Sequence, residues 1–349
     1  MSANLKARGG PSAKPVLAVA IGDPAGIGPE LAAKVAADRE VTDAARLIVI
    51  GDARVLARGA EQAGVALDLD ARREGDDLTP GDRPVLIDLG HCDPDSIRLG
   101  VAAKEGGAFA LRNFRTAIEL AAAGTADAVC FTPFNKAAMR MEHASYDDEI
   151  GYTAEVLGLG DLPAKEFNVL EGLWNARVTS HVPISAVAGL ITYDAVLEGI
   201  RLTDRSLRES GLARPRIGVA GLNPHAGDGG NFGHEDDEII APAVEAAKLE
   251  GLGADGPFPP DTVFVRAQKG AFDAVLTMYH DQGQIAMKLI GFDRGVTLLG
   301  GFPFPICTPA HGSAYDIAGQ GVANIGASRA ALLLAARMAS RRAGLAAAA

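Results

Sequence analysis

Three histidines stand at equivalent places in the sequence, each at or near the end of a run typical of a buried β-strand. His181 follows the residues ARVTS, His225 follows RIGVAGLNP and His280 follows DAVLTMY. Neutral imidazole is a good ligand for Zn²⁺, Co²⁺, Ni²⁺ or Mn²⁺, and three protein ligands with one open position make a catalytic metal site. A single such histidine is more often structural, but the shared position of the three favours a metal site.

Two glycine-rich segments could bind an anion or a nucleotide. GDPAGIGPE, at 22–30, lies between an expected strand and an expected helix, where free backbone N–H groups can bind an anion. Its spacing is not GxGxxG, so a Rossmann dinucleotide site is not expected, and a purely structural turn stays equally open. The second segment, TPAHGSAYDIAGQGVANIG at 308–326, combines small residues with Asp316 and Asn324 and could form a nucleotide or phosphate loop.

The elements that must position these residues follow an α/β pattern. Short β-branched runs alternate with Ala- and Leu-rich helical stretches, as in βαβ units. Such sheets bind ligands beyond the carboxyl ends of their strands, which is where the three histidines fall. A chain of 349 residues predicts two lobes, and the lack of a long linker indicates that they interleave. Strands are expected at 16–21, 46–52, 84–90, 127–135, 176–184, 216–225 and 273–283, and an amphipathic helix at 106–124.

Composition excludes several classes of protein. A formal net charge of −11 argues against a general nucleic-acid binder. Cys92, Cys130 and Cys307 form no CxxC pair, so neither a disulfide framework nor a thiolate zinc site is expected. No apolar run is long enough to span a membrane, and residues 1–14 lack the apolar core of a signal peptide. We therefore expect a soluble cytoplasmic protein with a disordered tail at 1–14.

With these motifs in view, the chain resembles the PdxA-like family of 4-hydroxythreonine-4-phosphate dehydrogenases. The resemblance runs from about Val16 to Arg337, and GDPAGIGPE, GLNPHAGDGG, PPDTVF, MYHDQG and HGSAYDIAGQG occur in the order of the family. The last motif is also similar to HGSAPDIAGKG, the adenosine-binding loop of isopropylmalate dehydrogenases. The resemblance implies a non-Rossmann, isopropylmalate/isocitrate dehydrogenase-like α/β fold and a homodimer with a shared active-site cleft.

The expected domains interleave. The first would comprise residues 15–145 plus 286–345 and carry the cofactor loop. The second would comprise residues 146–285 and carry the metal ligands and the dimer interface.

The resemblance also implies roles for individual residues. His181, His225 and His280 would bind a divalent metal such as Zn, Co, Mn or Fe, with one of them reaching across from the partner subunit. Lys288 and Thr153 match substrate contacts. Asp281 and Asp261 are candidates for orienting a ligand or moving a proton, because ligating imidazoles usually need a carboxylate or carbonyl partner. NAD or NADP would be bound by His311, Gly312, Ser313, Ala314, Asp316 and Asn324.

Three residues depart from the family pattern. Tyr152, Thr297 and Ile306 stand where members that use phosphorylated substrates have His, Asn and Arg. A charged hydrogen bond is worth about 1.5–3 kcal/mol, so three lost donors predict much weaker phosphate binding. A branch of the family with GY in place of GH, the terephthalate cis-dihydrodiol dehydrogenases, lacks the same groups. Tyr152 and Ile306 would offer that ring apolar walls, and Lys288 would hold its distal carboxylate.

The expected function is that of a divalent-metal-dependent NAD(P) dehydrogenase. It would oxidise a hydroxyl and then decarboxylate a small, carboxylated, non-phosphorylated cis-dihydrodiol such as terephthalate 1,2-cis-dihydrodiol, in aromatic catabolism. One alternative is a 4-hydroxythreonine-4-phosphate or phospho-threonate dehydrogenase that tolerates the three replacements. The other is a non-catalytic metabolite-binding homologue. The sequence leaves open the metal, the choice between NAD and NADP, and the general base.

Overall fold

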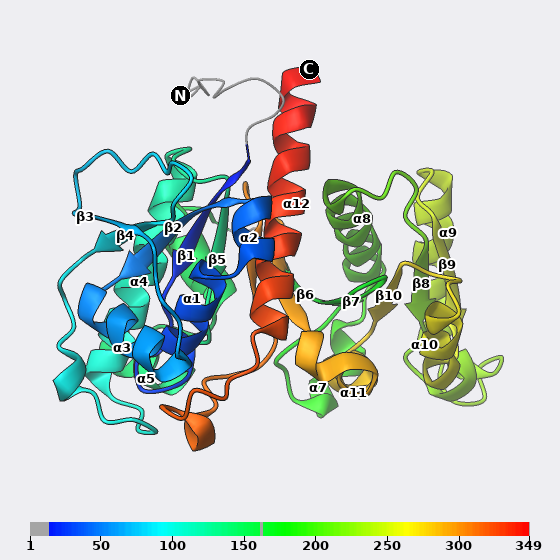
Figure 1. The fold of residues 1–349 in the computed structure, drawn as a ribbon. Coiled ribbons are helices and arrows are strands. Elements are labelled where there is room, and N and C mark those ends of the chain that lie inside the picture. Colours follow the sequence, from blue (N-terminus) through cyan, green and yellow to red (C-terminus); the bar gives the residue numbers. More distant parts are fainter. Residues whose placement is uncertain (1–13, 161–162, 349) are drawn as a thin grey trace. The chain divides into compact units, whose positions relative to one another are not determined.

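The computed structural model describes residues 14–160 and 163–348, which divide into two compact units (Figure 1). The first unit is built from two segments of the chain, Met1–Leu162 and Phe302–Ala349. The second unit is the segment between them, Pro163–Gly301. The chain therefore leaves the first unit once, builds the second, and returns to the first.

The first unit contains parallel strands in the order β3-β4-β2-β1-β5-β12. All five residues of β1, VLAVA, are buried, because a parallel strand covered on both faces needs an unbroken apolar run. Helix α12 runs as one long element at the C-terminal end of this unit (Figure 1). The strands are β1 (Val16–Ala20), β2 (Arg46–Gly51), β3 (Asp70–Arg72), β4 (Val85–Asp88), β5 (Ala128–Phe131) and β12 (Ile306–Pro309). The helices are α1 (Gly28–Ala36), α2 (Arg39–Ala44), α3 (Ala53–Ala63), η1 (Pro94–Ser96), α4 (Lys104–Ala122), α5 (Lys136–Glu142), α6 (Glu149–Leu157), η5 (Tyr315–Ile317) and α12 (Gly326–Ala348).

The second unit has a mixed sheet in the order β11-β6-β7-β10-β8-β9. β7, β10, β8 and β9 are parallel, whereas β6 is antiparallel to both β11 and β7. The strands are β6 (Lys165–Leu170), β7 (Leu173–Arg177), β8 (Ile217–Ala220), β9 (Ala254–Phe258), β10 (Ala274–Thr277) and β11 (Val296–Gly300). The helices are α7 (Ile184–Leu190), α8 (Tyr193–Ser210), η2 (Pro224–Gly227), η3 (Asp236–Ile240), α9 (Ala241–Leu249), α10 (Pro260–Gln268), α11 (His280–Gly291) and η4 (Phe292–Arg294).

Local sequence explains several helix ends. Asp148 accepts a hydrogen bond from the Gly151 N–H at the start of α6, and Thr192 caps α8 in the same way. Each of these helices ends at a glycine with positive φ, Gly158 and Gly211, a conformation that costs glycine little. The predicted α/β class is thus confirmed, with strands and helices alternating in both units.

The observed units differ from the predicted domains at two places. Helix α6 belongs to the first unit, where Tyr152 stacks on Phe114 of α4 with ring centroids 5.9 Å apart. Residues 286–301 belong to the second unit, because α11 packs on β7 and β10 and β11 pairs with β6. The domain boundary near 145 thus falls about one helix later, and the boundary near 285 about one helix and one strand later. Both shifts come from long-range packing that local patterns do not reveal.

The predicted tail lies outside the described residues, except that Lys14 donates from Nζ to the Thr42 carbonyl at 2.9 Å. Within the described part of the chain, no helix is both long and apolar enough to cross a membrane.

Candidate functional site

Two of the three histidines meet in the second unit. β7 ends at Arg177 and β10 at Thr277, and these residues are opposite each other in a parallel pair. The segments that follow the two strands therefore leave the sheet at the same edge. The His181 and His280 ring centroids lie 5.6 Å apart, and His280 Nδ1 is 3.0 Å from Asp281 Oδ1. That contact leaves Nε2 of His280 available for another ligand.

His225 lies in a strained loop of the same unit. Its φ is +56°, and Ala226 and Asp228 also have positive φ, at +55° and +46°. Non-glycine residues rarely adopt this conformation, and clusters of such strain are found at functional sites. The buried Asp236 anchors the loop, since its carboxylate accepts from the Leu222 N–H at 2.8 Å and also from Asn223.

The structure does not bring His225 together with the other two histidines. Among residues 14–160 and 163–348, no group of three or more His, Cys, Asp or Glu side chains is arranged to hold a metal ion. The resemblance assigned one ligand to a partner subunit, so two neighbouring histidines are what one chain would supply. The three-histidine site stays a prediction.

The remaining predicted residues of the second unit are accessible. Asp261, in the first turn of α10, and Lys288, on α11, are exposed. Thr297 is half-buried on β11, in register with Asn168 of β6. Their roles in substrate binding or proton transfer stay predictions.

The predicted cofactor loop follows β12 in the first unit. His311 is partly buried, which lowers the pKa of its imidazole and favours the neutral ring at pH 7. Ala314 has a φ of +44°, another strained non-glycine position. Asp316 and Asn324 are exposed, and Asn324 Oδ1 accepts from the Gly326 N–H at 2.7 Å, at the start of α12.

The GDPAGIGPE turn supports this loop. Several of its N–H groups already have partners: Gly22 donates to Thr132 Oγ1 at 2.8 Å, and Ile27 donates to the Ser313 carbonyl at 3.0 Å. A Cβ at Gly26 would lie 2.5 Å from the Ser313 carbonyl oxygen, so only glycine fits there. These contacts favour the structural reading of the turn over an anion site.

Two carboxylates of the GDPAGIGPE turn, Asp23 and Glu30, accept hydrogen bonds from the predicted cofactor loop. The hydroxyl of Tyr315 donates to Asp23, and burial raises the pKa of Asp23 despite that hydrogen bond. Glu30 Oε1 accepts from the Ala323 N–H at 2.8 Å and from Lys34 Nζ at 2.6 Å. Sequence reasoning missed this contact, although the i,i+4 spacing of Glu30 and Lys34 was a visible sign of an ion pair.

Three predicted substrate residues of the first unit are fully or almost fully buried. Tyr152 stacks on Phe114, and its hydroxyl lies 3.5 Å from the Leu111 carbonyl. Thr153 Oγ1 donates to the Glu149 carbonyl of its own helix at 2.6 Å. Ile306, with no exposed surface, lies in the interior strand β12. All three side chains pack within their own unit, and their contact with a substrate stays a prediction.

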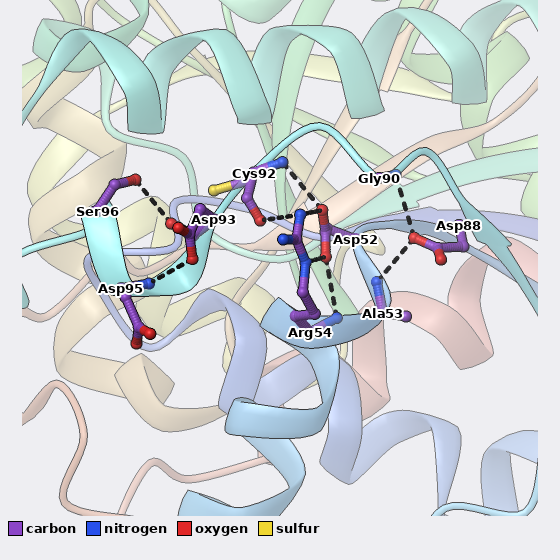
Figure 2. Close-up of polar contacts among 9 residues, drawn as sticks. All are labelled: Asp52, Ala53, Arg54, Asp88, Gly90, Cys92, Asp93, Asp95 and Ser96. Atoms are coloured by element: carbon purple, nitrogen blue, oxygen red, sulfur yellow. Dashed lines mark hydrogen bonds and ion pairs between the residues drawn. The ribbon is translucent and has the colours of Figure 1, made fainter.

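A polar cluster at the ends of β2 and β4 was not expected from the sequence (Figure 2). Asp52 accepts from the Cys92 N–H at 2.9 Å and from Arg54 Nε at 3.0 Å, while Asp88 accepts from the Ala53 N–H at 3.0 Å. Burial by itself raises the pKa of Asp52, but the hydrogen bonds from Arg54 and Cys92 outweigh it and lower the pKa to about 2. These bonds tie the segment after β4 to the start of α3, which is a structural role.

Comparison with known proteins identifies the relatives of this chain. Residues 43–335 match the family model described as pyridoxal phosphate biosynthetic protein PdxA. A protein of Rhizobium meliloti (strain 1021), provisionally named 4-hydroxythreonine-4-phosphate dehydrogenase 2, is 58% identical over 337 residues, which are 96% of this chain and 97% of the relative. The crystal structure of a 4-hydroxythreonine-4-phosphate dehydrogenase from Klebsiella pneumoniae is similar with a TM-score of 0.82 and 34% identity, covering 94% and 99% of the two chains. A terephthalate 1,2-cis-dihydrodiol dehydrogenase from Burkholderia xenovorans LB400 has a TM-score of 0.65 and 29% identity, covering 93% and 98%.

The predicted dihydrodiol substrate, and with it the role in aromatic catabolism, is therefore wrong. Relatives of higher identity are named for 4-hydroxythreonine 4-phosphate, and the dihydrodiol dehydrogenase is the more distant structure. The error came from reading Tyr152 and Ile306 as surfaces facing a ligand. Both pack in the interior of the first unit, so their residue types carry little information about the substrate. The resemblance itself is confirmed by the match over residues 43–335 and by the 58% identical relative, and the chain belongs to the PdxA family.

Proposed function

We propose that this protein is a divalent-metal-dependent dehydrogenase acting on a small phosphorylated hydroxy acid, 4-hydroxythreonine 4-phosphate or a phosphorylated threonate. It would transfer hydride from a CH–OH group to NAD or NADP. The observation that carries the proposal is the pair His181 and His280, with Asp281 at Nδ1, beyond the ends of adjacent parallel strands. The names of the relatives support the substrate and the reaction class.

The residues present fit a divalent metal. His181 is exposed, and the His280 side chain is 32% exposed, so both rings can reach a ligand. Imidazole nitrogens suit Zn, Co, Mn and Fe, and a carboxylate on the far nitrogen is the usual partner of a ligating histidine. When bound, such an ion would polarise a hydroxyl or carbonyl oxygen of the substrate. His225 would complete the set from the second subunit of a homodimer.

The protein's own side chains would bind and orient the substrate. Asp281 would orient the His280 ring by accepting from Nδ1, so that Nε2 is the nitrogen that would face the metal. The exposed ammonium of Lys288 would hold the phosphate as a point charge. Asp261 and Asp281 are the candidates to take the hydroxyl proton.

The chemistry of the substrate accounts for a second step. Loss of a hydride from the carbon β to a carboxylate, and of the proton from the hydroxyl on that carbon, turns the alcohol into a β-keto acid. The carboxylate can then leave as CO₂, because the carbonyl accepts the electron pair of the broken C–C bond. NAD or NADP, when bound, would supply the hydride acceptor, and the protein would position the substrate against it.

The cofactor would lie on the loop of the first unit that carries His311 to Ala314, Asp316 and Asn324. Asp23, Ile27 and Glu30 form hydrogen bonds with this loop. Its backbone is therefore already ordered without a bound cofactor. A preformed loop loses less conformational entropy on binding.

Metal titration tests the site directly. Isothermal titration of the metal-free protein with Co²⁺ should give saturable binding that is lost in His181→Ala and His280→Ala. His143→Ala is the matched control, since His143 lies in the first unit and is paired with Glu155 Oε2 at 3.0 Å. Equal Co²⁺ affinity in all four proteins would refute the ligand assignment. Saturable Co²⁺ and NAD⁺ binding without turnover of either phosphorylated substrate would instead favour the metabolite-binding alternative.

A further inference from the structure

A fully buried guanidinium belongs to Arg177, the last residue of β7. Arg177 has no exposed surface and is the bulkiest such side chain among the described residues. Its Nη1 donates to Asn168 Oδ1 at 2.6 Å, its Nε donates to Ser180 Oγ at 2.9 Å, and its Nη2 forms an ion pair with Glu166. Burying a charge is costly even when it is paired, so a residue of this kind needs an explanation beyond core packing.

One branch of the network reaches His181. Backbone hydrogen bonds extend the sheet from Val178 to Thr277 at 2.8 Å and from Thr179 to Met278 at 3.1 Å. The side chain of Ser180 supplies the next attachment, through Arg177 Nε. Ser180 directly precedes His181, so the guanidinium holds the last anchored residue before the exposed histidine.

The other branch reaches His280. Asn168 Oδ1, which accepts from Arg177, also accepts from Gln284 Nε2 at 2.9 Å. Gln284 is four residues after His280 on α11, so the two side chains project from the same side of the helix one turn apart. The segments that carry the two histidines therefore converge on one cation.

We propose that Arg177 is a positioning residue that sets the separation of His181 and His280. It does so through Ser180 on one side and through Asn168 and Gln284 on the other. Glu166 neutralises the guanidinium, and the planar fork of Arg, with donors in three directions, is needed to reach all three partners. This inference rests on the proposed metal-binding function of the two histidines.

Co²⁺ affinity of four variants tests the proposal. Arg177→Lys keeps the charge but not the fork, and Ser180→Ala cuts only the branch to His181. Outer partners of metal ligands typically change affinity about 10- to 100-fold, so Arg177→Lys should raise the Kd for Co²⁺ by that range and Ser180→Ala by about tenfold. Ser180→Thr keeps the hydroxyl and should restore the wild-type Kd.

Arg216→Lys is the matched control, because Arg216 makes a similar two-pronged pair with Asp273 in the same unit. It should leave the Kd unchanged. A residue with a merely structural role would lower the unfolding midpoint in urea without changing the Kd of the folded fraction.

The outcomes separate the two claims. Wild-type Co²⁺ affinity, within twofold, in both Arg177→Lys and Ser180→Ala would overturn the positioning role while leaving the metal site intact. If Arg177→Lys does not fold, Ser180→Ala with its Ser180→Thr rescue still decides the matter, since both keep the ion pair with Glu166. Failure of the wild-type protein to bind Co²⁺ would instead overturn the proposed function, and this inference with it.

Discussion

Replacing Lys34 with Met would remove the cation that joins helix α1 to the predicted cofactor loop. Lys34 Nζ donates to Glu30 Oε1 at 2.6 Å, to the Ala323 carbonyl at 2.7 Å and to the Gly321 carbonyl at 3.1 Å. The Glu30 side chain is only 1% exposed and that of Lys34 is 18% exposed. Lys34→Met therefore leaves a buried carboxylate without its counter-charge and two carbonyls without a donor.

The size of the effect follows from this burial. Removing one partner of a buried ion pair costs about 3–5 kcal/mol. Because Lys34 is partly exposed and water can reach the site, the expected loss of unfolding free energy lies at the lower end, about 3 kcal/mol. The double variant Lys34→Met/Glu30→Gln no longer buries an unpaired charge. Its loss should fall to about 1–2 kcal/mol, the value of one or two neutral hydrogen bonds.

Urea unfolding at pH 7, followed by far-UV circular dichroism, measures both losses. Lys248→Met is the matched control, because Lys248 pairs with Glu245 and Asp255 on the surface and should lose less than about 1 kcal/mol. NAD⁺ affinity should fall in Lys34→Met and stay unchanged in Lys248→Met. If Lys34→Met is as stable as Lys248→Met, the reasoning about the buried pair is refuted.

Three further substitutions, one of them with a comparison variant, probe other parts of the structure. Asp52→Asn should cost about 2 kcal/mol at pH 7, because the folded-state pKa of about 2 lies below the ordinary value of 3.8. The difference from wild type should shrink as the pH falls from about 4 to about 2, because the carboxylate becomes protonated in the unfolded chain before it does in the folded protein, and urea titrations at pH 7 and 2.5 would show whether it does. Gly283→Ala would place a Cβ 2.1 Å from Asn175 Oδ1, so the start of α11 must shift and Co²⁺ affinity should drop. Gly189→Ala, where a Cβ meets nothing within 4 Å, should leave stability unchanged or slightly raised, and equal Co²⁺ affinity in the two variants would contradict the crowding argument. Ile306→Arg would bury a charge in β12 and should lower the melting temperature sharply, whereas a stable variant with tighter phosphate binding would show that this position faces the substrate.

The strands could be predicted from local patterns, and with them the sheet edge beyond which His181 and His280 lie. The buried runs before His181 and His280 identify parallel strands, and parallel strands bring their carboxyl ends to one edge of a sheet. The small residues of HGSAYDIAG likewise indicate a close backbone approach, which Gly26 and Ser313 display.

What the sequence could not reveal depends on long-range pairing. Glu166, Asn168 and Arg177 read as ordinary strand residues until the antiparallel pairing of β6 with β7 and the packing of α11 bring them together. Tyr152 looked like a substrate contact because it stands where family members have the His of GHTE, yet its ring packs against Phe114 of α4. The direction of a side chain depends on where its helix docks, which a local motif does not specify.

Metal-dependent reduction of NAD⁺ by 4-hydroxythreonine 4-phosphate tests the central claim most directly. The protein would be stripped with a chelator, reloaded with Co²⁺, Zn²⁺ or Mn²⁺, and followed at 340 nm with the phosphorylated substrate and with unphosphorylated 4-hydroxythreonine. We expect turnover of the phosphorylated compound only after metal is returned, and none in His280→Ala. Equal rates with and without metal, or with and without the phosphate, would contradict a metal-dependent dehydrogenase of phosphorylated hydroxy acids.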